Sequence, residues 1–303
     1  MNRREHRRGV WAMIGATLCW STAGMLVRNM RLTDPWEMTF WRSLFMLVFV
    51  LAILLIQYRT AMAQRIRAIG KPGLIVGTLW ALMYVCFIVA LQLTTVANVL
   101  VLSSLSPFTA ALLGGLFLQE RVPSRVWMTM AAAVSGIVLM FMESLNSGAL
   151  AGNLIALVIP IAFAVNVVIL RKAHAQVDML PTLVLSGVLS MAVTLPLALP
   201  FEAVAIDFGL LAVMGVVQLG LGCVLMLFAA TRLSSAEIGL LAVLETVFGT
   251  LLTWLVVGES PGRLALLGGL IVVGALIANE LIGLRARSLT ASEAEAAVTQ
   301  AGR

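Results

Sequence analysis

The chain has 303 residues, of which 61% are hydrophobic and 11% are charged, and its formal net charge is +6. Soluble domains carry about 25% charged residues, so this composition excludes a soluble globular protein and indicates an integral membrane protein. The basic balance, with a pI near 10.0, is then a signal of membrane topology, and it does not indicate a nucleic-acid partner.

Continuous apolar runs of about twenty residues, the length that an α-helix needs to cross a bilayer, follow one another along the chain. The strands of a β-barrel would instead show short alternating segments. Charged residues, Pro and Gly separate the runs, as in "KPG" at 71–73 and "GESPGR" at 258–263. The sequence predicts an all-α polytopic membrane protein with ten transmembrane helices at 10–28, 36–56, 73–92, 96–118, 125–142, 152–171, 181–200, 208–230, 236–257 and 264–283.

The distribution of Lys and Arg predicts the orientation of these spans. If the basic segment 1–9 is cytoplasmic, sixteen Lys and Arg residues fall on the inner side and three, Arg28, Arg31 and Arg263, on the outer side. Positive side chains accumulate in cytoplasmic loops. We therefore expect both termini in the cytoplasm, the second as a polar cytoplasmic tail over 284–303.

An internal repeat divides the chain. "LAVLETVFGTLLTWLVVGE" at 241–259 aligns without a gap on "LSSLSPFTAALLGGLFLQE" at 102–120, and both stretches end in Glu. A second pair is "WSTAGMLVR" at 20–28 and "FAVNVVILR" at 163–171. Each half holds five predicted spans, an odd number, so the second half enters the membrane in the opposite sense. Inverted repeats are typical of secondary transporters, whose substrate site lies near the midplane where the halves meet.

The repeated stretches resemble the end of the fourth helix in each EamA repeat of the drug/metabolite transporter superfamily. Trp20 in the first span and Arg42 in "FWRSLF" also resemble that family. The resemblance covers nearly the whole chain and implies EamA repeats over 10–142 and 152–283, in a multi-pass protein of the bacterial inner membrane most similar to exporters of aromatic amino acids. Thr246 and Gln119 depart from the family pattern, which has Pro and Gly there. The first departure puts a proline kink in the ninth span in doubt.

Two tryptophans, Trp20 and Trp80, lie at mid-depth in their spans, whereas the other five fall near span ends. Trp80 has Tyr84 and Phe87 at i+4 and i+7, so the three rings share one helix face. This face fits either core packing or the aromatic wall of a cavity. We favour the wall, because few side chains of such a bundle are both aromatic and amphipathic at mid-depth.

Small polar side chains lie at similar depth in other spans. Asn and Gln inside a bilayer must find hydrogen bonds, either from neighbouring helices or from substrate and water, and the sequence leaves both interpretations open. Together with the aromatic residues they form the predicted substrate-binding set: Trp20, Trp80, Tyr84, Asn98, Ser103, Ser106, Asn166, Gln218 and Glu245.

Glu245 is the strongest single signal, because a carboxylate at mid-membrane costs about 2.5 to 3.5 kcal/mol. Three interpretations compete. The carboxylate pairs with Arg42, the sole intramembrane cation; or it is protonated and purely structural; or it faces a hydrated cavity, where it meets a substrate ammonium or carries protons. We favour the third. Glu120 and Glu259, at span ends, are interpreted as structural.

Enzyme motifs such as H-E-x-x-H, G-x-S-x-G and the Walker P-loop are absent, so the sequence predicts no enzyme, no catalytic residues and no cofactor. Two His and three isolated Cys predict no metal site. We predict a monomeric secondary transporter that contacts only membrane lipids and its small-molecule substrate. It exports small amphipathic metabolites, with neutral or aromatic amino acids favoured, by alternating access around a central cavity. The alternative is efflux of lipophilic cations.

Overall fold

The computed structural model describes residues 3–59, 62–119, 124–172, 179–233 and 235–301. Throughout these ranges the regular structure is helical and contains no strand. Nine helical stretches in them are long and apolar enough to cross a membrane, and one shorter apolar stretch, Val126–Met142, coincides with the fifth predicted span. The prediction of an all-α polytopic membrane fold is confirmed.

The first half of the chain forms helices at each of its five predicted spans. Two of these spans, the first and the fourth, are divided into two helices each. The order is α1 (Arg3–Ser21), α2 (Ala23–Arg28), α3 (Pro35–Tyr58), α4 (Met62–Arg67), α5 (Gly70–Leu93), α6 (Val96–Ser103), α7 (Ser106–Leu118) and α8 (Ser124–Ser147).

The second half also forms helices at its five predicted spans. The eighth span contains a π-helical segment, and the last helix runs far beyond its predicted span. The order is α9 (Leu150–Lys172), α10 (Met179–Ala198), α11 (Ala205–Val213), the π-helix η2 (Met214–Leu221), α12 (Gly222–Ala230), α13 (Ser235–Val257) and α14 (Arg263–Ala301).

A proline explains the break between α6 and α7. Pro107 has no N–H, so the carbonyl of Ser103, four residues earlier, loses its helical donor. The hydroxyl of Ser106 donates a hydrogen bond to that carbonyl instead, at 2.7 Å. In the second half Thr246 takes the proline position, and α13 continues without a break. The departure from the family pattern therefore has the structural effect that the sequence suggested.

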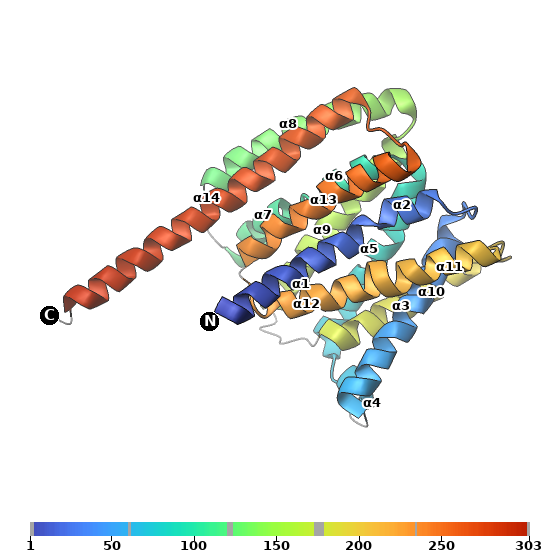
Figure 1. The fold of residues 1–303 in the computed structure, drawn as a ribbon, viewed down its shortest axis with the longest axis horizontal. Coiled ribbons are helices and arrows are strands. Elements are labelled where there is room, and N and C mark those ends of the chain that lie inside the picture. The colour runs from blue at the N-terminus through green and yellow to red at the C-terminus, as the bar shows by residue number, and fades with distance from the viewer. Residues whose placement is uncertain (1–2, 60–61, 120–123, 173–178, 234, 302–303) are drawn as a thin grey trace.

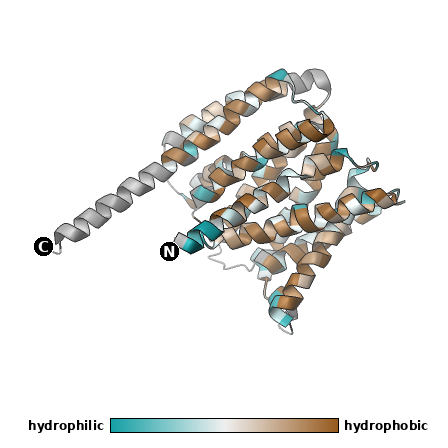
Figure 2. Ribbon diagram, in the orientation of Figure 1, coloured by the Kyte–Doolittle hydropathy of each residue, from teal (hydrophilic) through white to brown (hydrophobic). Residues whose placement is uncertain are grey.

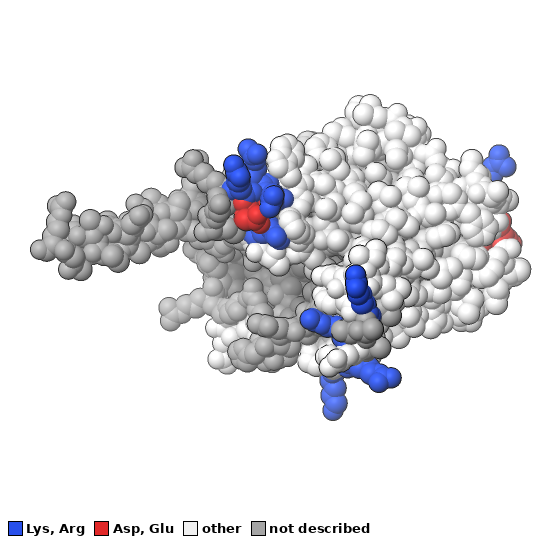
Figure 3. All heavy atoms as spheres, turned by 60° about the horizontal axis from the view of Figure 1, so that its bottom comes forward, with Lys and Arg blue, Asp and Glu red and all other residues white. Residues whose placement is uncertain are grey.

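Polar contacts join the connections between helices at both ends of the bundle. At one end the N-terminal Glu5 accepts a hydrogen bond from Arg232 at 2.9 Å. At the other end Glu259 pairs with Arg28, with 2.6 Å between Oε2 and Nε. Figure 3 shows Lys and Arg gathered at the N-terminal end and around α4, with a broad uncharged band beside them. This separation of charge along the bundle suits a protein that crosses a bilayer.

The surface between the two ends is apolar. Hydrophobic residues follow the long helices in Figure 2, while hydrophilic residues concentrate at helix ends. Large apolar side chains are exposed on many helices, among them Leu55, Ile56, Leu116, Met128 and Leu255. In water such a surface would drive association, whereas in a membrane it faces lipid tails.

Helices α8 and α14 pack side by side along one edge of the bundle (Figure 1). Gly136 of α8 and Gly268 of α14 lie against each other where the helices cross, and a Cβ on Gly136 would lie 2.5 Å from the carbonyl oxygen of Gly268. Such small residues let two backbones approach closely inside a membrane. Beyond this crossing α14 remains helical to Ala301, so the predicted tail over 284–303 continues the last helix through most of its length.

Candidate functional site

A buried arginine on α3 organises the polar interior. Arg42 is only 3% exposed, and its Nε donates a hydrogen bond to Oε1 of Gln218 on η2 at 3.2 Å. Its Nη1 has no hydrogen-bond partner among the residues that the structure describes. The ion pairs found among the described side chains do not include Arg42. Because a cation inside an apolar bundle is costly, an arginine held in this way is a candidate functional residue.

The aromatic face of α5 lies against this guanidinium. The Cζ of Arg42 is 5.8 Å from the ring centroid of Tyr84 and 5.6 Å from that of Phe87, both within cation–π range. The ring of Trp80 continues the row, with its centroid 6.0 Å from that of Tyr84. Ser186 on α10 lies on the other side of Tyr84 and donates a long hydrogen bond to its hydroxyl, at 3.5 Å. The predicted aromatic face is therefore in contact with polar groups of both halves.

Gln218 lies in the π-helix η2, which approaches α3 closely. A π-helical turn holds more residues than an α-helical turn, and such segments are frequent at functional sites. Gly215, in the same segment, packs against the backbone of α3, where a Cβ would lie 2.6 Å from the carbonyl oxygen of Arg42. Backbone therefore meets backbone at this point. The short distance between α3 and η2 brings the amide of Gln218 within reach of the guanidinium.

A small hollow lies beside this cluster. Its volume is about 10 Å³, and its lining comes from Trp80, Leu183, Cys223, Met226 and Leu227. Cys223 and Tyr84 belong to one buried cluster, against which Trp20 and Trp80 pack. The three predicted aromatic residues thus come together where α1 and α5 of the first half meet α10 and α12 of the second. A hollow of this size holds about one water molecule, so a metabolite needs the helices to move apart before it can bind.

Glu245 lies on α13 and is half-buried. Its backbone accepts a hydrogen bond, because Ser21 Oγ donates to the carbonyl oxygen of Glu245 at 3.4 Å. No ion pair joins Glu245 to Arg42, although both side chains are described. The pairing interpretation of Glu245 is therefore wrong for this structure. Cys223 lies within electrostatic range of both charged groups.

The other predicted polar residues divide into two groups. Asn166 on α9 is 3% exposed, and neither its amide oxygen nor its amide nitrogen has a partner, as is also true of the hydroxyl of Ser103. The amide nitrogen of Asn98 donates hydrogen bonds to Thr94 and Asn153, at 3.1 and 3.2 Å, while its amide oxygen has no partner among the described residues. Ser106 is used at the helix break. The prediction that these four bind substrate remains a prediction, and the free groups of Asn166 and Ser103 fit it best.

The sequence-based set omits Arg42, which the structure places at the centre of the polar contacts. Arg42 entered the sequence analysis as a residue of the family resemblance and as a possible partner for Glu245, and not as a substrate-binding residue. A signal was available, because an arginine eight residues into a 24-residue apolar helix is a functional candidate in its own right. Cys223 carried no such signal, since an isolated buried thiol is usually a packing residue.

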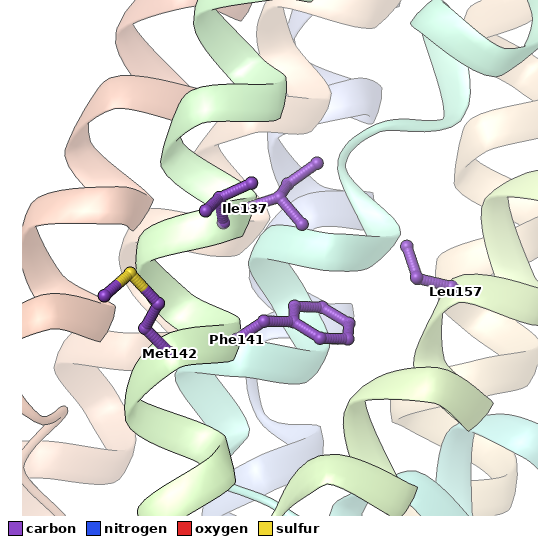
Figure 4. A pocket seen from close by; sticks show the side chains of 5 residues that line it. Ile137, Phe141, Met142 and Leu157 are labelled. Carbon is purple, nitrogen blue, oxygen red and sulfur yellow. The ribbon is translucent and has the colours of Figure 1, made fainter.

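A larger hollow lies between α8 and α9, with a volume of about 420 Å³. Figure 4 shows Ile137, Phe141 and Met142 of α8 on one side and Leu157 of α9 on the other. With Val138, these side chains complete a lining that is entirely apolar. The hollow offers no group that could orient a polar substrate, and its surface is suited to lipid tails.

Comparison with known proteins agrees with the fold. A solved crystal structure superposes with a TM-score of 0.62 at 17% sequence identity, covering 91% of this chain and 98% of the other. Two curated relatives, both named pseudopaline exporter CntI and both from Pseudomonas aeruginosa strains, are 27% identical over 277 residues, which is 90% of this chain and 95% of each relative.

The family comparison covers most of the chain. The profile of the EamA-like transporter family matches twice, over residues 7–142 and over residues 150–279. These two matches coincide with the two halves that the internal repeat predicted, to within a few residues at each boundary. The chain belongs to the EamA-like transporter family.

Proposed function

We propose that the chain is a secondary transporter of the bacterial inner membrane that exports small amphipathic metabolites, with neutral or aromatic amino acids as the favoured substrates. The two halves, each with five spans, are related as an inverted repeat. They move against each other so that a central site opens to the two sides of the membrane in turn. The relatives named as exporters support the direction of transport, though their named cargo is pseudopaline.

The observation that carries this proposal is the cluster shared by the two family matches. Trp20 and Trp80 come from the first match, and Cys223 comes from the second. A substrate site of a transporter with two repeats is expected at such an interface. Aromatic rings with a few polar groups suit a substrate that has an apolar side chain and a small charged head.

Efflux of lipophilic cations is the second candidate. The carboxylate of Glu245, which forms no ion pair with the described side chains, favours it. Arg42 disfavours it, because a buried guanidinium without a carboxylate repels a cation in the same cavity. A zwitterion suits both charged side chains, and for this reason amino acids remain the first candidate.

Reporter fusions test the topology on which alternating access depends. A reporter placed after residues 95, 205 or 260 should be periplasmic, and one placed after residues 65, 232 or 303 should be cytoplasmic. The expectation follows from the excess of Lys and Arg on the second set of loops. A periplasmic C-terminus, or the same side for residues 205 and 232, would contradict the inverted arrangement.

Transport into proteoliposomes tests the function directly. The wild-type protein should accumulate labelled phenylalanine, tryptophan or leucine in preference to cationic dyes, and Trp80→Ala should weaken this transport several-fold. Losing one aromatic contact costs about 0.5 to 1.5 kcal/mol beyond area burial, which corresponds to that change. The measurement is the initial rate at equal reconstituted protein.

Trp127→Ala is the matched control, because Trp127 is 53% exposed on α8, away from the cluster. It should transport like the wild type. Lower abundance of Trp80→Ala with an unchanged rate per molecule would show that Trp80 is a packing residue. Uptake of dyes without uptake of amino acids would favour the cation-efflux alternative.

A further inference from the structure

The free donor of Arg42 is the feature that the fold leaves unexplained. A guanidinium presents five N–H donors and no acceptor. In this structure Nε is bonded to Gln218, while Nη1 is buried without a partner. A buried donor without a partner destabilises the fold, and more strongly when the group is charged. A buried donor of this kind is expected where a ligand supplies the missing hydrogen-bond acceptor.

The groups around Arg42 are neutral. The rings of Tyr84 and Phe87 and the amide of Gln218 reduce the cost of burying the charge. None of them carries a negative charge. The cluster therefore still attracts an anion, although it is stable enough to hold the arginine in place.

The arginine is also held in position. Its Nε is fixed by Gln218, and the backbone of α3 at Arg42 lies against Gly215 of the π-helix. Two aromatic rings connect the guanidinium to the hollow: Tyr84 lies against Arg42 and neighbours Trp80, and Trp80 lines the hollow. A ligand that enlarges the hollow from the Trp80 side thus meets Tyr84 and then the guanidinium.

We propose that Arg42 and Gln218 form a carboxylate-binding subsite for the transported substrate. The proposal rests on the proposed function and specifies its substrate class: compounds with a carboxylate head group and an apolar or aromatic body. The planar guanidinium matches the two oxygens of a carboxylate. The amide nitrogen of Gln218 offers a further donor beside it. The body of the substrate then lies along Trp80 and Tyr84.

A carboxylate fits better than a phosphate group. A phosphate monoester carries close to two negative charges and three acceptor oxygens, and it is usually bound by several cations or by a helix N-terminus. Arg42 is the sole Lys or Arg within the apolar part of the predicted spans. One guanidinium balances one carboxylate, and the remaining wall is aromatic.

The substitution Gln218→Glu gives the sharpest test, because it places a carboxylate of the protein itself beside Arg42. The variant should fold at least as well as the wild type, since the buried charge gains a partner. It should also lose the ability to distinguish phenylalanine from phenylalaninamide. The wild type is expected to prefer the acid by about tenfold or more, as for one charge-assisted hydrogen bond. Arg42→Gln should lose the same preference, and Arg42→Lys should retain part of it.

Gln92→Glu is the matched control. Gln92 is a half-buried glutamine near the end of α5, where its amide contacts Met38 Sδ at 3.2 Å, and the variant should keep the preference for the acid. If Gln218→Glu and Arg42→Gln lower transport of phenylalanine and its amide by equal factors, Arg42 has a structural role and the subsite is refuted.

A binding measurement separates this proposal from the proposed function. Indole-3-acetate should raise the melting temperature of the purified wild-type protein more than indole-3-acetamide does, and Gln218→Glu should abolish the difference. If no amino acid is transported but the acid still raises the melting temperature more than the amide does, the subsite is supported and amino acids are excluded as the substrate. If amino acids are transported and the wild type shows no difference between acid and amide, the subsite falls and the function stands.

Discussion

Glu245→Gln is expected to reduce transport of amine-bearing substrates by about tenfold or more, the loss typical for one hydrogen bond to a charged group. The substitution keeps the size of the side chain and its hydrogen-bonding capacity but removes the charge. Glu245 lies near the middle of α13 with no cationic side chain paired to it. We therefore expect its carboxylate to face the central site when that site opens, where it meets a substrate ammonium or exchanges a proton. The measurement is proteoliposome uptake of phenylalanine from mildly acidic to mildly alkaline pH.

Glu237→Gln controls for the loss of a carboxylate on the same helix. Glu237 lies in the first turn of α13, where its carboxylate is 3.4 Å from His6, so its replacement should leave uptake and its pH dependence unchanged. Wild-type uptake by Glu245→Gln at every pH, with normal abundance, would leave the structural-acid interpretation of Glu245 standing.

Glu259→Ala is expected to produce the largest loss of stability. Its carboxylate joins three segments: Oε2 is 2.6 Å from Arg28 Nε, and Oε1 accepts a hydrogen bond from the first N–H of α6, at Val96, at 2.7 Å. Arg28 also donates to the carbonyl oxygen of Thr94 at 2.8 Å. Removing one partner of a buried ion pair costs about 3 to 5 kcal/mol, and we expect the lower end because each side chain retains about a fifth of its exposure. Thermal unfolding in detergent measures the loss.

The double variant Arg28→Met/Glu259→Leu separates the ion pair from a general sensitivity of this end of the bundle. Removing both charges avoids a buried unpaired ion, so the double variant should be more stable than Glu259→Ala. Arg31→Ala, in the same connection but exposed, should unfold like the wild type. A double variant no more stable than Glu259→Ala would contradict the ion-pair explanation.

The positions of the helices could be predicted from the sequence because the bilayer imposes their length and composition. Every span that the hydropathy pattern predicted coincides with a helical region of the structure. The interruptions were harder to predict. Pro107 divides α6 from α7 through a missing N–H, which is a local cause and readable in principle. The π-helix η2 has no comparable local signal, because it depends on how the eighth span packs against α3.

The packing of the aromatic residues could be anticipated from the sequence, whereas their role in binding substrate stays a prediction. Trp20, Trp80 and Tyr84 do pack against one cluster, because mid-depth aromatic residues on inward faces have few other places to lie. Asn98 was expected in the same site, but it is bonded to Thr94 and Asn153. Its partners lie 4 and 55 residues away in the sequence, so the choice between substrate and protein as partner could not be made from spacing alone.

The sequence by itself determined that this protein lies in a membrane, where its spans approximately end, and that it divides into two similar halves. These properties follow from composition, periodicity and repetition, which are local or additive along the chain. Only the tertiary structure decided which buried charges have partners. Arg42 and Gln218 are 176 residues apart, and their contact exists because Gly215 lets η2 approach α3. Likewise Arg42 on α3 and Glu245 on α13, both described, form no ion pair, and spacing along the chain could not have shown this. Coulomb energy depends on the distance between two charges and on the surrounding medium, and neither can be read from the separation of two residues in the sequence.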